Sequence, residues 1–251
     1  IRTLRGHNRV NSVSFNSDGN KIKRGTGYDV LIIDYKSLVN SQIRITNKLL
    51  KDKIEIAVPY KKQDICIYNN DDAIIWNTLT GDTVHILKGC TKRIESAAYS
   101  YDGNFVAFGL SNNRIAVCNV LTEEVVIPYN RHHVDIESLA FSHAGNYVVT
   151  GSDDHTAIIW DALTGDTIRT LRGHKGKINS VAFSYDDKYI VTGSSDSTSI
   201  IWEVATGDTI RSWKAADAIN YVAFASDDCN VILGSFWNNV YILNDWEVDK
   251  T

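Results

Sequence analysis

Two groups of histidine, threonine and aspartate in the second half of the sequence contain the residue types of a hydrolytic triad. They are His132, Thr150 and Asp154, and His174, Thr192 and Asp196. In such a triad the aspartate orients the histidine, which takes the proton of the hydroxyl nucleophile. Each member of the second group lies 42 residues after its counterpart in the first, whereas a catalytic site would occur once. The repetition favours a structural role over catalysis.

The period of 42 residues runs through nearly all of the 251 residues of the chain. Its clearest column consists of Asp34, Trp76, Cys118, Trp160, Trp202 and Asn244. A tryptophan that recurs with a period of about 40 residues, at the end of a short apolar run, indicates one supersecondary unit repeated several times. The column therefore predicts six copies of that unit.

Within the clearest copy, four short apolar runs alternate with turn residues. The runs cover residues 178–183, 189–193, 199–202 and 209–213. They are rich in isoleucine, valine, phenylalanine and threonine, which favour strands over helices. Turns such as residues 101–104 and 164–166 repeat from copy to copy and contain glycine, which hairpins need where φ is positive. No stretch has a sustained helical period, so the sequence predicts an all-β chain.

Paired motifs recur at the start and at the end of the copies. They are Gly6-His7 and Gly173-His174 at the start, and Trp76-Asn77, Trp160-Asp161 and Trp202-Glu203 at the end. Together these motifs resemble the WD-repeat β-propeller family, in which each repeat forms a four-stranded blade and the blades pack around a channel. The resemblance covers essentially the whole chain. It is weakest over residues 35–72, which we interpret as a divergent blade.

The resemblance implies a single β-propeller domain over residues 1–251, with six blades. Residues 1–7 have the same sequence as residues 168–174, which would be an outer strand and the turn after it, and residues 218–245 supply only three strands of the sixth copy. We therefore expect the N-terminal strand to close the last blade, which would remove an exposed sheet edge. The chain begins with isoleucine and contains no methionine, so a longer protein with a seventh blade stays open.

Regular blades of this family contain a buried polar tetrad. A turn aspartate holds the histidine, the histidine meets a serine or threonine hydroxyl, and the hydroxyl meets the tryptophan indole, so that each buried polar group has a partner. Carried over to this chain, the resemblance implies two structural tetrads. They are His132, Thr150, Asp154 and Trp160, with Arg131 in place of the usual glycine, and His174, Thr192, Asp196 and Trp202.

The other copies depart from the tetrad. In the first copy Arg24 and Asp34 stand in the threonine and tryptophan columns, and we expect them to form a buried ion pair, since a lone buried charge would be costly. In the third copy Phe108 and Asn112 stand in the threonine and aspartate columns. We expect such blades to depend on packing and to be the softer part of the ring.

Composition excludes several kinds of function. The net charge of −4 argues against a surface for nucleic acid or an anionic membrane, and no apolar run approaches the length of a membrane span. The four cysteines have no spacing typical of metal ligands or redox pairs, and no asparagine lies in a glycosylation sequon. We expect an intracellular, cytoplasmic protein without metal or cofactor.

Three classes of function are compatible with this repeat architecture. A protein–protein interaction scaffold is the first expectation, by analogy with the fold. The alternative is a structural or assembly component of a larger particle. An enzyme at the channel mouth is the third, but the sequence has no cluster of carboxylates, histidines or cysteines outside the repeats, so we expect no catalytic residues.

The sixth copy marks a candidate binding surface. Its turn reads Phe236-Trp237-Asn238, where the regular copies have small polar residues, and exposed aromatics on a hairpin are typical interface anchors. The same face is expected to bring together a partly basic rim: Arg9, Tyr28, Arg93, Arg114, His133 and Lys177. Such a rim favours an acidic or phosphorylated segment of another protein as partner. Two alternatives stay open, a merely solvated rim and aromatics that pack inward against the neighbouring blade.

Overall fold

The computed structural model shows strands joined by turns. It describes backbone and side chains of residues 94–122, 124, 131–225, 230–237, 239–244 and 246, and the backbone alone of residues 12–15, 21–26, 29–34, 55–57, 64–68, 73–77, 83–87 and 125–130. These residues contain strands β1 to β22 and no helix. The prediction of an all-β chain is confirmed for the part of the chain that the structure describes.

The chain divides into two compact units, and every sheet lies within one of them. The continuous unit, Asp52–Gly173, contains three antiparallel sheets of four strands. The first sheet consists of β4 (Glu55–Ala57), β5 (Asp64–Tyr68), β6 (Ala73–Asn77) and β7 (Thr83–Leu87). The second consists of β8 (Ile94–Tyr99), β9 (Phe105–Leu110), β10 (Arg114–Asn119) and β11 (Val125–Asn130). The third consists of β12 (Ile136–Phe141), β13 (Tyr147–Ser152), β14 (Thr156–Asp161) and β15 (Thr167–Arg172).

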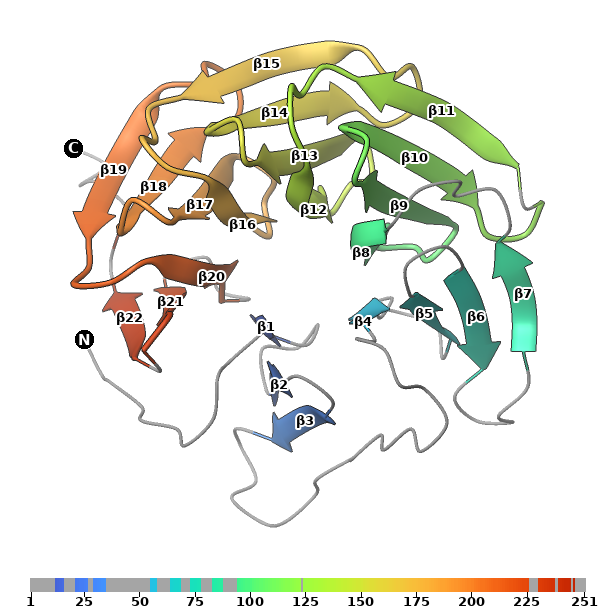
Figure 1. Cartoon of the computed structure of the whole chain (residues 1–251), viewed down its shortest axis with the longest axis horizontal. Helices are drawn as coiled ribbons and strands as arrows, with labels where there is room; N and C mark the ends of the chain where they lie inside the picture. The colour runs from blue at the N-terminus through green and yellow to red at the C-terminus, as the bar shows by residue number, and fades with distance from the viewer. Residues whose placement is uncertain are drawn as a thin grey trace. The chain divides into compact units, whose positions relative to one another are not determined.

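The two-segment unit comprises Ile1–Lys51 and His174–Thr251. One of its sheets has four strands, β16 (Ile178–Phe183), β17 (Tyr189–Ser194), β18 (Thr198–Glu203) and β19 (Thr209–Lys214). Two sheets have three strands among the described residues: β1 (Ser12–Phe15), β2 (Lys21–Thr26) and β3 (Asp29–Asp34), and β20 (Ile219–Phe224), β21 (Asn230–Ser235) and β22 (Val240–Asn244). In each sheet, strands that follow one another in the chain are neighbours (Figure 1). The four runs of the clearest copy are β16 to β19, as predicted.

Apolar runs become central strands because these strands are covered on both faces. In β13 and β14, five of six residues are buried, whereas the edge strand β15 alternates between exposed and covered positions. The turns follow the glycine pattern. Gly103 between β8 and β9 has a φ of 71°, and Gly165 between β14 and β15 has a φ of 78°, a region that residues with a Cβ rarely adopt. The hairpin turns predicted at these places are therefore confirmed.

Glycines at the ends of second strands let adjacent sheets of one unit approach each other closely. A Cβ added at Gly193 in β17 would lie 2.6 Å from Cγ2 of Ile219 in β20, and one added at Gly109 in β9 would lie 2.8 Å from Cγ2 of Ile136 in β12. Around these contacts the facing sheets form cores. Trp160 and Ile136 belong to the core of the continuous unit, and Ile219 to that of the two-segment unit.

The strand register shows that Leu243, and not Asn244, occupies the tryptophan position in the sixth copy. Trp202 lies opposite Ile190, and the equivalent residue opposite Val231 is Leu243, which is 6 % exposed. Asn244 lies opposite Asn230, one position further along, and is exposed. The prediction for Asn244 was wrong because the link from β19 to β20 is one residue shorter than the link from β15 to β16.

Register also bears on the ion pair expected in the first copy. Asp34 lies opposite Lys21, and Arg24 lies opposite Leu31. Because strand positions alternate between the two faces of a sheet, a separation of three residues between Lys21 and Arg24 does not favour the pair. The side chains themselves lie outside the described residues, as do residues 1–7, which were expected to close the last blade.

Candidate functional site

The first polar set lies in sheet β12–β15 of the continuous unit. His132 Nδ1 is 2.9 Å from Asp154 Oδ2, and His132 Nε2 is 2.7 Å from Thr150 Oγ1. The indole N–H of Trp160 donates to Thr150 Oγ1 over 2.8 Å. The contacts that the resemblance implies for this set are thus present, with Arg131 in the place of the usual glycine.

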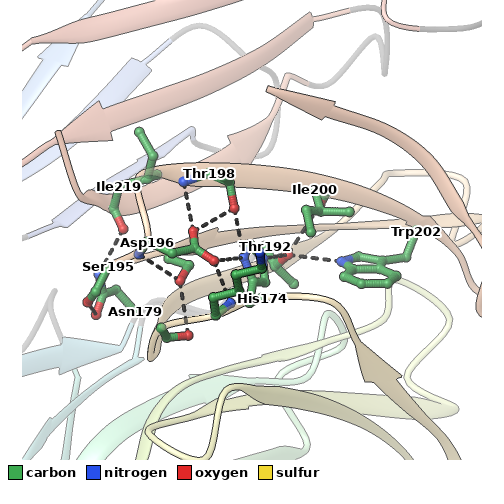
Figure 2. Close-up of polar contacts among 12 residues, drawn as sticks. His174, Asn179, Thr192, Ser195, Asp196, Thr198, Ile200, Trp202 and Ile219 are labelled. Atoms are coloured by element: carbon green, nitrogen blue, oxygen red, sulfur yellow. Dashed lines mark hydrogen bonds and ion pairs between the residues drawn. The ribbon is translucent and has the colours of Figure 1, made fainter. Parts of the chain in front are cut away.

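The second polar set has the same arrangement in the two-segment unit, where Figure 2 shows His174 between Asp196 and Thr192. His174 Nδ1 is 3.1 Å from Asp196 Oδ2, and His174 Nε2 is 2.7 Å from Thr192 Oγ1. Trp202 Nε1–H donates to Thr192 Oγ1 over 2.9 Å. The two sets agree closely because the strands that carry them have the same register, with Trp160 opposite Val148 and Trp202 opposite Ile190.

One arrangement of hydrogens satisfies every member of the second set. A neutral His174 donates from Nδ1 to Asp196 and accepts at Nε2 from the Thr192 hydroxyl, whose oxygen accepts from Trp202. Burial lowers the pKa of His174 and outweighs the Asp196 carboxylate, which raises it. Burial opposes ionisation of Asp196, yet hydrogen bonds from Thr198 and the Lys175 amide lower its pKa to about 2. A neutral imidazole beside an ionised carboxylate therefore fits both groups.

The aspartate of the first set is ionised for similar reasons. Burial raises the pKa of Asp154, but hydrogen bonds from His132 and Thr156 outweigh this and hold the pKa well below its usual range. The His133 amide also donates to Asp154 Oδ2 over 3.1 Å. The carboxylate thus joins the turn between β13 and β14 to the chain that leads into β12.

Both sets have the connectivity of a hydrolytic triad, but neither hydroxyl is accessible to a substrate. Thr150 and Thr192 are 0 % exposed, and each hydroxyl oxygen already accepts a hydrogen bond from an indole. Nucleophilic attack needs an accessible oxygen beside the substrate. These two groups are therefore unsuited to catalysis, and their geometry is that of a satisfied buried network.

In sheet β8–β11 the described residues in the threonine and tryptophan columns cannot form such a network. Phe108 and Cys118 stand in the threonine and tryptophan columns and are 0 % and 2 % exposed. Both belong to an apolar core cluster with Val106 and Ala116. The expected dependence of this sheet on packing agrees with that cluster, whereas its expected softness stays a prediction.

The aromatic pair of the sixth copy lies on the turn between β21 and β22. Phe236 is 41 % exposed and Trp237 is 69 % exposed, and their rings meet edge to face at 5.4 Å. The alternative in which both aromatics pack inward therefore does not hold in this structure. These two residues form the most exposed aromatic group among the described residues.

The expected basic rim is described only in part. Arg114 and His133 are exposed in the continuous unit, and Lys177 is half-buried in the two-segment unit. In its own unit, each lies at the strand ends where second strands turn into third strands. Arg9, Tyr28 and Arg93 lie outside the described residues.

Sequence reasoning missed one buried residue close to the aromatic turn in the chain. Trp246 is 0 % exposed and packs edge to face against Tyr189 at 4.8 Å and Phe224 at 5.3 Å. Its carbonyl accepts a hydrogen bond of 3.3 Å from Arg211 Nη1. Trp246 lies outside the tryptophan column, so the repeat period gave no signal for it.

Among the described residues, no group of three or more histidine, cysteine, aspartate or glutamate side chains could hold a metal ion. In the same part of the chain, no helix is long and apolar enough to cross a membrane.

Comparisons with known proteins identify the repeats. Three segments match the family model described as WD domain, G-beta repeat (WD40): residues 1–22, 124–161 and 165–203. The second and third segments contain the two polar sets. A search of curated proteins found no match.

Proposed function

The chain is a WD-repeat protein, and on that premise we propose that it is an interaction scaffold that binds a partner protein through the turn between β21 and β22. WD40 repeats have a β-propeller-like fold and generally mediate protein–protein interactions. The buried tetrads connect the strands of their sheets through hydrogen bonds, whereas the residues at the tips of the turns can differ from copy to copy. Specific binding therefore belongs to the turns that differ from the regular copies.

The observation that carries this proposal is the exposure of Trp237. An indole with 69 % of its surface in water on a two-strand hairpin is unusual, because tryptophan is largely buried on average. Large aromatic side chains on rigid turns bury much area with little loss of conformational entropy, and they dominate many interfaces. Phe236 supports the indole from the side.

For the partner we propose an acidic or phosphorylated segment. Lys175 is exposed and Lys177 half-buried in the link that leads into β16, and Lys214 is exposed at the end of β19. All three belong to the same unit as the aromatic turn and lie at the corresponding strand ends. Arg114 and His133 would extend this basic character in the continuous unit. Nucleic acid and membrane stay outside the proposal.

A ring of six blades, closed by the N-terminal strand, is part of the same proposal. The support is that six sheets occur among the described residues, and that β20–β22 shows three strands there and lacks a fourth. Residues 1–7, which repeat the sequence of an outer strand, are the natural fourth strand. The alternative function, an assembly component, would use the same edge to bind another copy of the chain.

The test is recovery of partners from a cell lysate by the whole chain and by two matched variants. Trp237→Ala removes the proposed anchor, and Tyr185→Ala removes an aromatic that is 45 % exposed on the turn between β16 and β17, at the other strand ends. We expect Trp237→Ala to lose a distinct partner that Tyr185→Ala retains, with nearly unchanged melting temperatures. The partner is then purified and its binding to each variant measured directly. Equal recovery by both variants would refute the proposal, and recovery of mainly the chain itself would favour the assembly component.

A further inference from the structure

Two leucines at equivalent turn positions of the continuous unit are exposed to solvent. Leu121, between β10 and β11, is 68 % exposed, and Leu163, between β14 and β15, is 66 % exposed. They lie 42 residues apart, and after another 42 residues the turn between β18 and β19 has Ala205 instead. A backbone hydrogen bond from the Gly165 amide closes the turn with Leu163 over 3.0 Å. The same bond, from the Gly207 amide over 2.8 Å, closes the turn with Ala205, so the turn itself does not need a leucine.

Within each of the two sheets, the turn with the leucine is bonded to the turn between the first and second strands. In sheet β8–β11 the Val120 amide, next to Leu121, donates to the Asn104 carbonyl over 2.8 Å. Ala162 and Asn146 make the same bond in sheet β12–β15, also over 2.8 Å. Both turns of a sheet therefore lie at the same strand ends, as antiparallel neighbours require (Figure 1).

A ring contact joins these strand ends across the two sheets. Tyr101, between β8 and β9, and His143, between β12 and β13, have ring centroids 4.7 Å apart. The two exposed leucines and this ring pair thus belong to one end of sheets β8–β11 and β12–β15. We call Leu121, Leu163, Tyr101 and His143 the leucine surface.

The charged residues described in these four turns are all acidic. They are Asp102, Glu124, Asp161 and Asp166. The arginines described in the same two sheets and their links lie at the other strand ends or within β15: Arg114, Arg131 and Arg172, and Arg169. The Thr164 amide donates to Asp161 Oδ1 over 2.8 Å and lowers the pKa of this carboxyl, so Asp161 is charged at neutral pH. The leucine surface therefore lies among negative charges.

Exposed apolar side chains rimmed by polar groups are typical of interaction sites, and charge complementarity selects the partner. We propose that the leucine surface is a second docking site, at which a basic segment of a partner protein covers Leu121 and Leu163 with apolar side chains while its lysines or arginines face the surrounding carboxylates. A second copy of this surface is a poor match, because like charges would then face each other. The proposal goes beyond the aromatic turn between β21 and β22, since a scaffold with both sites would bring a basic and an acidic partner together.

The first experiment titrates an acetylated Lys-Leu-Lys-Lys-Leu-Lys peptide into the whole chain by calorimetry. Its counterparts are Lys-Ser-Lys-Lys-Ser-Lys, which has the same charge without apolar side chains, and Glu-Leu-Glu-Glu-Leu-Glu, which has the opposite charge. We expect the lysine–leucine peptide to bind at least roughly tenfold more tightly than either counterpart, because only this peptide offers both apolar area and positive charge. Added salt should weaken its binding. Equal affinities for the lysine–leucine peptide and either counterpart would overturn the proposal.

The second experiment locates the bound peptide with matched variants. Leu163→Ala reproduces the residue that the chain already has at Ala205, so the variant should fold, and it should weaken the lysine–leucine peptide by roughly tenfold. Tyr185→Ala, which removes an exposed aromatic from the two-segment unit, is its control and should leave the affinity unchanged.

The charge is tested in the same way. Asp166→Asn should weaken the peptide by about twofold to fivefold, the range of an exposed ion pair. Asp208→Asn is the control, because Asp208 is an exposed aspartate at the equivalent position of the turn between β18 and β19. Equal effects of a variant and its control, either for the leucine or for the aspartate, would show that the peptide does not bind at the leucine surface and would overturn the proposal.

Sedimentation without peptide tests the other occupant of this surface. We expect the whole chain and Leu163→Ala to sediment alike at every concentration. An oligomer that Leu163→Ala dissociates would show that a second copy covers the leucine surface, and the proposal would be wrong.

Failure of this proposal and failure of the proposed function can be distinguished. If Trp237→Ala loses its partner while Leu163→Ala leaves the peptide affinity unchanged, the proposed function stands and the leucine surface is wrong. If Leu163→Ala weakens the peptide while partner recovery does not depend on Trp237, the leucine surface binds a basic segment and the aromatic turn is not the binding site.

Discussion

Sheets β8–β11 and β12–β15 of the continuous unit fill the same two positions in opposite ways. In β12–β15, Thr150 and Trp160 are joined by a hydrogen bond that continues to His132. In β8–β11 the corresponding residues are Phe108 and Cys118, which are buried in an apolar cluster. A repeat position can therefore be filled by a satisfied polar network or by plain packing.

The comparison separates what the fold requires from what the tetrad adds. Replacing a complete buried network by well-packed apolar groups can be neutral for stability, whereas removing one member is costly because the others lose their partners. In sheet β8–β11 the replacement of the polar network by apolar residues is not complete. Asn112 stands in the aspartate column, and its buried Oδ1 has no hydrogen-bond partner among the described residues. The fold requires occupied volume at these positions, and the tetrad is one way to provide it.

The largest effect is expected from breaking the packed sheet. Phe108→Ala removes a side chain that is 0 % exposed and leaves a cavity, which should cost about 3–5 kcal/mol of unfolding free energy. Denaturant unfolding of the whole chain measures this loss. Phe108→Leu, which keeps most of the volume, is the control and should cost far less. Equal costs for the two variants would show that the volume of Phe108 does not support the sheet.

A somewhat smaller effect is expected from breaking the polar sheet. Thr150→Val keeps the shape but leaves the Trp160 indole N–H and His132 Nε2 without their shared partner, which should cost about 2–4 kcal/mol. Thr170→Val on the exposed face of β15 is the matched control and should change the unfolding free energy little. If Thr150→Val were as mild as the control, the tetrad would contribute no stability, and the two sheets would not differ in kind.

The smallest effect is expected from pH, and His174 and Asp196 of the second polar set should contribute to it. The folded-state pKa of His174 is lowered, so between that pKa and the ordinary value near 6.5 the unfolded chain binds more protons than the folded chain. Stability should therefore be fully present above about pH 6.5 and decline as the pH falls below it. A second decline should follow below about pH 4, as Asp196, with a folded pKa of about 2, becomes protonated first in the unfolded chain.

Urea unfolding at a series of pH values measures this dependence. His174→Gln should flatten the decline below pH 6.5, whereas His133→Gln, which changes an exposed histidine, should leave it as it is. An unchanged slope in His174→Gln would mean that the buried imidazole is not the group that titrates.

The sequence predicted the strands well because the regular copies have apolar runs of strand length separated by short stretches of turn residues. The members of the two polar sets were implied by the resemblance to the WD-repeat family, which transfers well here because a satisfied buried network constrains every residue type in it. The prediction failed at Asn244, where a link shorter by one residue moved the register, since a column counted by period cannot detect a deletion. Nothing in the sequence indicated that Trp246 would be buried, because Trp246 lies outside the repeating column. Nor could the sequence show that the Ser235 hydroxyl has no hydrogen-bond partner among the described residues, because that depends on the local geometry of one turn.

Gly193 shows how strongly one atom can determine mutational tolerance in such a chain. Alanine is the substitution that experimenters regard as mild, yet at Gly193 its methyl group would meet Ile219 Cγ2 at 2.6 Å and Val222 Cγ1 at 2.7 Å. Both neighbours are β-branched and cannot rotate away freely. An alanine scan would therefore report a severe lesion at a residue that has no side chain to lose, and we expect sheet β20–β22, which carries the aromatic turn, to be displaced with it.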